Sequence, residues 1–596
     1  MRWPALSICL MLSLGGAVHA QANKCACGVN PPVKPANRVM EPYANEPADM
    51  RPFSKFTKPY HEHYTNLVEY NGAARDARTI PASQVSEVPI AFLGPVREHK
   101  DEKLGKAMLH GAQMAIDEAN ARGGYGGKPF TLVVHNDGAV WGASSNEIVK
   151  MAYEDNAWAM LGSISGDSTH IALRVSLRAE LPMVNSAATD PTIPETIIPW
   201  ILTSIQDDRV QCFTLARHIY SELGLKRIAL LRVNERYGRF GVGKFKDASR
   251  RLGHPVIIEQ KYMPGDMDFA RQLRVINDSR VDGIVIWADA APAGMILKQM
   301  RAMGMKQPVF GSHRTIGTEL FENAGEAAEG FQAVYPYDPT RDDAAWIGFQ
   351  KRFKDKYSAD VDSFSALGFD TMNILLDSIC KAGLNRGAIR DALYSYQSYK
   401  GVTGEMIFDP NAKNTAPMYL GTVKGGRLEF RRAPMDPPYA KTSDAAPAFH
   451  GPAMPDSKPV IAIIGAKADQ VAAGIAAPGY TLIGINSEAA WGKASTELVK
   501  AVYDNSAVAI IATDRLASHL AEQIGSKTFV PVLAVSDDRT LTSTNVPWIF
   551  RLPAANSTDE AVTYLIGAAK NAANNRTLLR DALAASGRFT GTGEPR

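Results

Sequence analysis

Short apolar runs alternate with longer amphipathic stretches along most of the chain between residues 88 and 335. Each longer stretch has about 12 to 18 residues, and its apolar positions recur every three or four residues, as on one face of a helix. This alternation is typical of βαβ units and predicts mainly parallel, doubly wound α/β sheets. Residues 88 to 432 leave room for two of them. The runs that we expect to be strands are 89–94, 130–135, 158–161, 182–184, 227–233, 256–259, 283–287 and 330–335.

Small hydroxyl and glycine residues follow two of these strands. An open α/β sheet presents backbone N–H groups and hydroxyls to a ligand where its strands pass into helices, beyond their carboxyl ends. The alternative is that the serines and threonines only cap helices. The candidate binding residues are Ser163, Ser165, Gly166, Asp167 and Ser168 in the first loop, and Ala187, Ala188 and Thr189 in the second.

The composition limits the classes of protein to which the chain can belong. The chain has 596 residues, of which 45% are hydrophobic and 21% charged, so it can bury several cores. Its formal net charge is only +3 and the basic residues are scattered. These values indicate no nucleic-acid partner and no membrane-surface binding.

The first 20 residues have the pattern of a secretory signal peptide. Arg2 precedes an apolar run, and Val18-His-Ala20 offers a small-residue cleavage site. We expect a mature periplasmic chain that does not span a membrane. No later segment has the roughly 18 to 20 apolar residues that a transmembrane helix needs. Residues 21–85 are rich in proline and lack a period, which predicts an extended arm.

Four cysteines remain after the expected cleavage: Cys25, Cys27, Cys212 and Cys380. An oxidising compartment permits disulfides, but the spacing does not choose among the three possible pairings. Cys25 and Cys27 could form a metal site with His61 and His63. A surface loop or a local disulfide is the simpler interpretation of the C-x-C spacing, and we predict no bound metal.

The last part of the chain repeats the first sheet region. A proline- and alanine-rich linker covers 433–457, and 458–596 then repeats segments seen earlier. The repeat has lost its counterpart of roughly 209 to 365. We therefore predict a degenerate copy of one lobe that packs or dimerises, with a docking surface for a transporter as the alternative. The matching segments include 481–500 with 131–150, 530–533 with 181–184, and 580–583 with 390–393.

Residues 86–432 resemble the type I periplasmic binding proteins, in the leucine/isoleucine/valine-binding branch that serves ABC importers. The resemblance implies two α/β lobes joined by three crossovers that close on a ligand like a hinge. Lobe one would comprise 86–206 and 336–398, and lobe two 207–335 and 399–432. The motifs that carry it are at 90–95, 111–124, 186–191, 236–238, 327–331 and 368–370.

The resemblance also implies how a ligand is held. Family members bind an amino acid's carboxylate with hydroxyls and N–H groups that match the 163–168 loop, Ala187 and Thr189, and with a tyrosine that matches Tyr237. Neutral donors in a dry cleft suit an anion without burying a counter-charge.

Two departures from the family pattern concern the ammonium group. In the family, a loop carries the acidic residue that binds the ligand's ammonium group, and in this chain that loop is Gly311-Ser-His-Arg314. The family tyrosine that packs against the ligand's side chain is absent near Ala291. His313 or Arg314 would repel an ammonium, so either Asp289 substitutes for the missing acid or the ligand lacks an amine.

Nothing in the sequence favours an enzyme. Gly238-Arg-Phe-Gly-Val-Gly243 has the wrong spacing for a dinucleotide loop, and Gly162-Ser-Ile-Ser-Gly166 places isoleucine at the nucleophile position. We expect no cofactor. Two functions remain: a transport receptor that hands a small amino acid, amide or carboxylate to an ABC permease, and a sensor or partner-binding protein that uses the same cleft.

Overall fold

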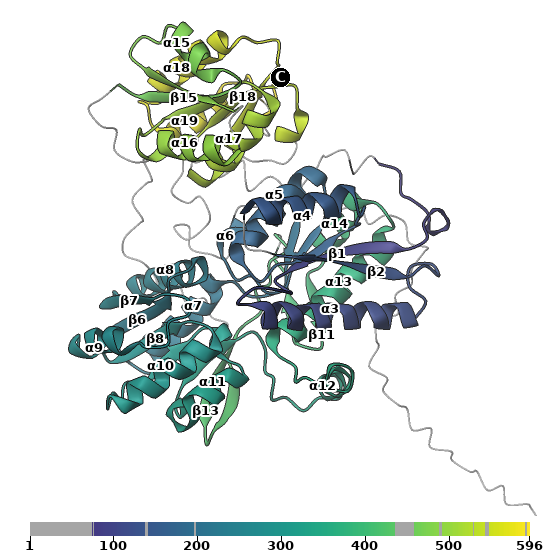
Figure 1. The fold of residues 1–596 in the computed structure, drawn as a ribbon, viewed down its shortest axis with the longest axis vertical. Helices are drawn as coiled ribbons and strands as arrows, with labels where there is room; N and C mark the ends of the chain where they lie inside the picture. Colours follow the sequence, from purple (N-terminus) through teal and green to yellow (C-terminus); the bar gives the residue numbers. More distant parts are fainter. Residues whose placement is uncertain are drawn as a thin grey trace, which may run out of the picture.

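The computed structural model of the chain describes most of its residues from 77 onward, as drawn in Figure 1. The signal peptide, most of the proline-rich arm and linker, and the Cys25, Cys27, His61 and His63 group lie outside the described residues, so these predictions stay as they are. The described residues are 74, 77–137, 141–195, 198, 200–409, 411–434, 458–487, 491–528, 530–542, 548–589 and 593–596.

The first lobe is built on a five-stranded parallel sheet with the order β2-β1-β3-β4-β5. The long helices α3 (Glu102–Ala121) and α13 (Ser363–Ala382) pack on one face, and α4 (Trp141–Tyr153) and α5 (Gly166–Ala179) on the other. Because helices cover both faces, β1 is buried almost throughout. The strands are β1 (Val88–Gly94), β2 (Phe130–Asn136), β3 (Met160–Gly162), β4 (Met183–Asn185) and β5 (Ile201–Thr203).

The second lobe has a seven-stranded sheet, β14-β13-β10-β9-β8-β6-β7. Helices α7 (Asp208–Arg217) and α8 (Arg236–Arg251) cover one face, and α9 (Ala270–Asp278), α10 (Ala290–Ala302) and α11 (Thr318–Ala324) cover the other. Only the edge hairpin of β13 and β14 is antiparallel. The strands are β6 (Ile228–Val233), β7 (Ile258–Tyr262), β8 (Gly283–Trp287), β9 (Val309–Gly311), β10 (Gln332–Tyr335), β13 (Tyr419–Lys424) and β14 (Arg427–Arg432).

Close packing fixes the helix that later borders the cleft. A Cβ atom at Gly241 in α8 would lie 2.1 Å from the indole Nε1 of Trp287 in β8. Only glycine lets α8 approach the sheet this closely. The first residues of α8 are thereby held against the carboxyl end of β8.

Three crossover segments connect the two lobes and bind one another. The side-chain amide of Gln206 in the first crossover donates to the carbonyls of Pro336 (3.4 Å) and Ala416 (3.1 Å) in the other two. Asn414 donates to the carbonyl of Ser204 at 2.6 Å. Lys413 and Asp207 form a buried ion pair at 3.0 Å. The crossovers therefore form one hydrogen-bonded hinge.

The remaining elements belong to the first lobe or to short connections. The hairpin of β11 (Ser398–Gly401) and β12 (Gly404–Ile407) contributes Met406 to the core that α3 and α13 share. The short helix α6 (Thr192–Glu195) follows β4, α12 (Ala344–Tyr357) precedes α13, and α14 (Arg386–Tyr394) follows it.

The C-terminal part repeats the first lobe. Its sheet, β16-β15-β17-β18-β19, has the same parallel strand order as the first one. This confirms the predicted internal repeat and the fold class. The elements are β15 (Val460–Gly465), α15 (Ala468–Gly474), β16 (Thr481–Asn486), α16 (Trp491–Tyr503), β17 (Ala509–Ala512), α17 (Arg515–Thr528), β18 (Val532–Val535), β19 (Ile549–Leu552), α18 (Thr558–Asn571) and α19 (Arg576–Ala585).

The predicted strands are all found, with ends that differ by at most three residues. The strands β5 and β9 and the strands of the two hairpins, β11 to β14, were not predicted. Among the cysteines, Cys212 is a buried free thiol, and Cys380 is disulfide-bonded to a partner outside the described residues.

Within the described ranges, no helix combines the length and apolar character of a membrane span. The same ranges contain no cluster of acids, histidines and cysteines that fits a metal ion.

We predict that Lys413→Met destabilises the hinge by about 3–5 kcal/mol, because it leaves the carboxylate of Asp207 buried without its partner. Urea unfolding monitored by tryptophan fluorescence measures the loss. The control is Lys424→Met, which removes an exposed ion pair with Glu429 and should cost about 0–1 kcal/mol. Equal effects of the two substitutions would contradict the structural role of the hinge pair.

Candidate ligand-binding cleft

A cavity of about 310 Å³ lies between the two lobes. The first lobe contributes the loop before α3, the loop before α5 and the loop after β4, and the second lobe contributes the start of α8 and Arg314. This volume is at the lower end of the range for small-molecule sites. Its lining residues are His99, Lys100, Asp101, Ile164, Ser165, Gly166, Asp167, Ala187, Thr189, Asp190, Asp208, Glu235, Arg236, Tyr237, Arg239, Phe240 and Arg314.

The N-terminus of α5 forms one wall of the cavity. Ser165 is the N-cap, and its hydroxyl accepts from the N–H of Ser168 at 3.5 Å. The N–H groups of Gly166 and Asp167 open the helix on the cavity wall. A helix N-terminus favours an anion through these donors and through its dipole. This wall can therefore hold a carboxylate.

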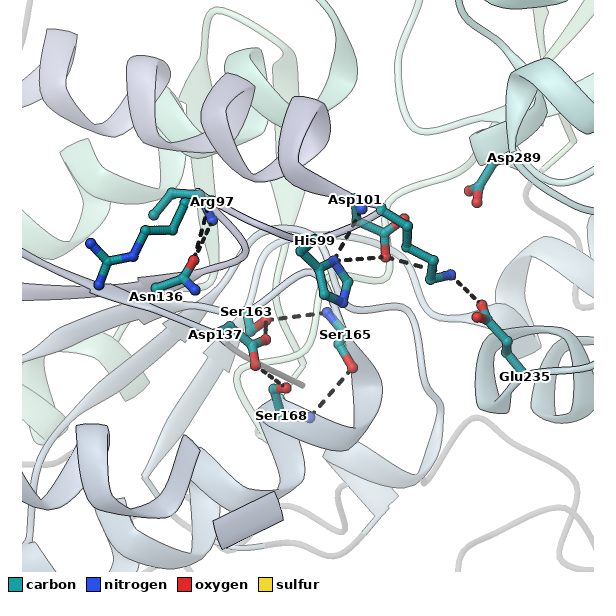
Figure 2. Close-up of polar contacts among 12 residues, drawn as sticks. Arg97, His99, Asp101, Asn136, Asp137, Ser163, Ser165, Ser168, Glu235 and Asp289 are labelled. Carbon is teal, nitrogen blue, oxygen red and sulfur yellow. Dashed lines mark hydrogen bonds and ion pairs between the residues drawn. The ribbon is translucent and has the colours of Figure 1, made fainter. Parts of the chain in front are cut away.

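Two of the predicted hydroxyls support this loop and do not line the cavity. Ser163 and Ser168 donate to the two carboxylate oxygens of Asp137, at 2.6 and 2.7 Å (Figure 2). All three side chains are buried. A buried carboxylate needs such donors, so these serines hold the loop that carries Ser165.

The second predicted loop is shaped by Asn185. The N–H groups of Ala187 and Ala188 both donate to its side-chain oxygen, at 3.1 and 2.9 Å. Ala187 and Thr189 line the cavity, and Ala188 does not. The backbone donors of this loop are thus already used within the protein.

Tyr237 faces the cavity from the second lobe. Its hydroxyl donates to Ser312 at 2.7 Å, and the guanidinium of Arg314 lies 4.6 Å from its ring centroid. Burial raises the pKa of Tyr237 well above its usual value. The phenol therefore stays protonated.

Arg314 is held by two acids from different lobes. Its Nε donates to Asp289 at 2.6 Å, and its Nη2 donates to Asp101 at 3.3 Å. Burial alone would lower the pKa of Arg314, but the two carboxylates raise it. Asp289 is thus paired with a guanidinium and does not line the cavity.

His313 is buried behind the cavity wall. Its backbone N–H donates to the side-chain oxygen of Gln211, and its Nδ1 lies 3.1 Å from the same atom. Burial and the neighbouring Arg314 lower the pKa of His313 to about 3. The imidazole is neutral, so neither His313 nor Arg314 presents an uncompensated positive charge to a ligand.

Asp208 lines the cavity and was not predicted. Both of its carboxylate oxygens are buried, without a well-formed hydrogen bond within the described part of the chain. Burial, together with Asp190 and Asp207, raises its pKa well above the usual value, and the nearby Thr189 hydroxyl only partly opposes this. The one signal in the sequence is the acidic pair Asp207-Asp208, which follows β5 after three intervening residues.

His99 was also missed, because it lies in a charged loop without a recognisable motif. His99 and Ser165 both line the cavity, and Figure 2 draws them on the same side of the cleft. The N–H of Asp101 donates to Nδ1 of His99 at 3.0 Å. Because Nδ1 accepts this hydrogen bond, the ring nitrogen that can donate is Nε2, and His99 lines the cavity.

Ion pairs cross the cleft from one lobe to the other. Lys100 binds Glu235 at 2.5 Å, and Arg236 binds Asp190 at 2.5 Å. Lys103 pairs with Glu319, and Arg314 with Asp101. These contacts hold the two lobes together around the cavity.

The chain belongs to the periplasmic binding protein family, since residues 87–427 match the sequence profile described as Periplasmic binding protein. The Leu/Ile/Val/Thr-binding protein of Salmonella typhimurium is 25% identical over 322 residues, which cover 54% of this chain and 84% of that protein. The Leu/Ile/Val-binding protein of Citrobacter freundii is 25% identical over 246 residues, 41% of this chain. The match spans 65% of the length of that relative.

Solved structures share the two-lobe fold. The branched-chain amino acid transporter substrate-binding protein LivJ from Streptococcus pneumoniae, in complex with isoleucine, has a TM-score of 0.54 and 23% identity over 58% of this chain and 99% of that one. An ABC transporter solute-binding protein from R. palustris, in complex with benzoate, has a TM-score of 0.53 and 18% identity over 58% of this chain and 96% of that one.

We predict that Ser168→Ala lowers the stability of the first lobe by about 1.5–3 kcal/mol, because it removes a hydrogen bond to the buried Asp137 carboxylate. Chemical unfolding measures the change. The comparison is Ser165→Ala, which removes the N-cap hydroxyl in the cavity wall and should weaken ligand binding as well as the helix. A loss of affinity in Ser168→Ala that matches Ser165→Ala would contradict the division of roles.

Proposed function

We propose that the protein is an extracytoplasmic solute-binding protein of an ABC importer that captures a small amino acid by closure of its two lobes. The observation that carries this proposal is the interlobe cavity with an anion-binding helix terminus on one side and the buried carboxyl of Asp208 on the other. The two groups suit the two charges of an amino acid. Related carboxylates and amides would use the same anion-binding wall.

The ligand's carboxylate would lie at the start of α5. The hydroxyl of Ser165, the N–H groups of Gly166 and Asp167, and the Nε2–H of His99 can donate to it. The phenol ring of Tyr237 and the ring of Phe240 would cover the ligand's apolar part, since both line the cavity.

The ammonium would pair with Asp208. Asp289, the substitute considered from the sequence, is engaged by Arg314, whereas Asp208 has a buried carboxyl with unused acceptors. An unpaired buried carboxyl is costly, and a ligand ammonium would relieve that cost. The neutral His313 and the paired Arg314 remove the repulsion that had counted against an amine.

Closure explains how binding is signalled. A ligand that contacts both lobes favours the closed state by its differential affinity, and the ion pairs across the cleft add to it. A permease would read that state. We place the mature protein in the periplasm, in line with its family and its signal-like first residues, with no catalytic role.

The relatives support the ligand class. Curated relatives carry names of leucine, isoleucine, valine and threonine binding, and the fold neighbours hold isoleucine or benzoate. All of these ligands have a carboxylate. The proposed amine site is what distinguishes an amino acid from benzoate here.

We predict that Asp208→Asn weakens binding of the best amino acid by about 2–5 kcal/mol, because the ammonium loses its buried charge partner. Thermal-shift screening of amino acids, amides and amine-free carboxylates identifies that ligand, and isothermal titration measures its affinity. The control is Asp355→Asn on the exposed side of α12, which should change nothing. Full affinity in Asp208→Asn, or stabilisation by amine-free acids alone, would contradict the proposed amine site.

We also predict opposite pH trends for binding and for stability. Amino-acid affinity should rise as the pH rises through the elevated pKa of Asp208, because only the ionised carboxylate pairs with an ammonium. The stability of the ligand-free protein should fall over the same interval, because the unfolded chain ionises Asp208 more readily. Titrations and thermal unfolding at several pH values test both. In Asp208→Asn both trends should flatten, and persistence of either would contradict the assignment.

A further inference from the structure

The outward face of helix α5 is buried, although α5 lies on the outside of the first sheet. Ser176 points to the sheet, since its hydroxyl donates to the sulfur of Met160 in β3. Arg174 lies two residues earlier, roughly 200° around the helix, and therefore points away from the sheet. Yet Arg174 is only 7% exposed and Leu177 only 3%. Another part of the protein must cover this face.

The C-terminal copy provides the cover. One hydrophobic core cluster contains residues of the first sheet, α4 and α5 together with residues of α16, α17 and the C-terminal sheet. The opposite faces of the two sheets belong to two separate clusters. The two units therefore meet on the α4/α5 side of the first sheet and the α16/α17 side of the C-terminal sheet, and Figure 1 draws the copy beside the α4 and α5 side of the first lobe.

The two contacting surfaces are equivalent. Helices α16 and α17 are the repeats of α4 and α5, as the matching segments and the identical strand orders show. Each of the two units contains the same polar cluster of a histidine, an aspartate and a threonine. His170 lies 3.8 Å from Asp190, which binds Thr192, and His519 lies 2.9 Å from Asp538, which binds Thr540. Like surfaces that meet in this way form an isologous interface, as in a twofold dimer.

The copy has kept its packing elements and lost its ligand-binding ones. Arg576 binds the carbonyls of Val502 and Ala507, as Arg386 binds those of Ala152 and Ala157. The counterpart of α3 is reduced to the seven residues of α15, and no second lobe faces the copy among the described residues.

In the first lobe, the ion-pair partner of Asp190 comes from the second lobe. In the copy, the partner of the equivalent aspartate comes from the copy itself. Arg236 of α8 binds Asp190 across the cleft, whereas Arg515 of α17 binds Asp538 at 2.7 Å. The copy thus pairs the carboxylate of Asp538 with an arginine of its own and needs no partner lobe for this ion pair. This is expected of a unit that is retained for its packing surface.

We infer that the α4/α5 face of the first lobe is a self-association surface, and that the C-terminal copy occupies it as a second copy of that lobe supplied by the same chain. The intact protein is then a monomer with an internal dimer-like contact. This inference goes beyond the proposed transport function and does not depend on the ligand.

A protease site inserted in the linker between residues 434 and 458 of the full chain tests the contact. After cleavage, both parts should sediment together as one complex, because the helix surfaces hold them without the linker. Separation of the two parts at the concentrations used for the intact chain would overturn the inference. Ligand titration of the cleaved protein shows separately whether the proposed function holds.

Substitution of the covered face tests its location. Arg174→Glu with Leu177→Glu should release the copy from the cleaved protein, because Leu177 belongs to the shared core cluster and Arg174 is buried on the outward face of α5. The control is Arg250→Glu on α8, whose side chain is 65% exposed and which should leave the complex intact. An intact chain that dimerises, with chemical cross-links between the α4 and α5 helices of two chains, would contradict occupation of this face by the copy.

Discussion

The hydrogen-bonded hinge determines how the two lobes are connected, and the arrangement of the cleft depends on it. The three crossovers are bound to one another through Gln206, Asn414 and the buried Lys413–Asp207 pair. None of these groups lines the cavity, so the contacts that join the crossovers and the contacts available to a ligand are made by different residues. The cleft residues come from loops at the ends of buried strands, and their positions follow from the packing of each lobe. Ligand recognition therefore depends on rigid lobes and one flexible connection.

Charge balance in the cleft determines which ligand it can accept. Arg314 is compensated by Asp101 and Asp289, and Arg236 by Asp190. These pairs consume charges that the sequence alone would assign to a ligand. The groups that remain for an amino acid include the helix terminus at the start of α5 and the carboxyl of Asp208, whose burial raises its pKa. The site thus offers one place for an anion and one for a cation.

Most of the fold could be predicted from the chain, and less of the site. The alternation of apolar runs and helical stretches gave the sheets, and the repeated segments gave the C-terminal copy. Ser165, Gly166, Asp167, Ala187, Thr189 and Tyr237 do line the cavity. Ser163 and Ser168 bind Asp137 instead, which no spacing reveals, because this partner follows a different strand, β2. Asp208 and His99 carry no motif, and only the meeting of two lobes brings them to one cavity. The partnership of Arg314 with two acids is likewise a tertiary contact.

The central claim is that the cleft holds an amino acid through both of its charges. The most direct measurement is mass spectrometry of the small molecules released when protein purified from its native host is denatured. The account predicts one amino acid per chain, absent from Asp208→Asn protein prepared in the same way. One equivalent of an amine-free carboxylate, retained equally by Asp208→Asn, would contradict it.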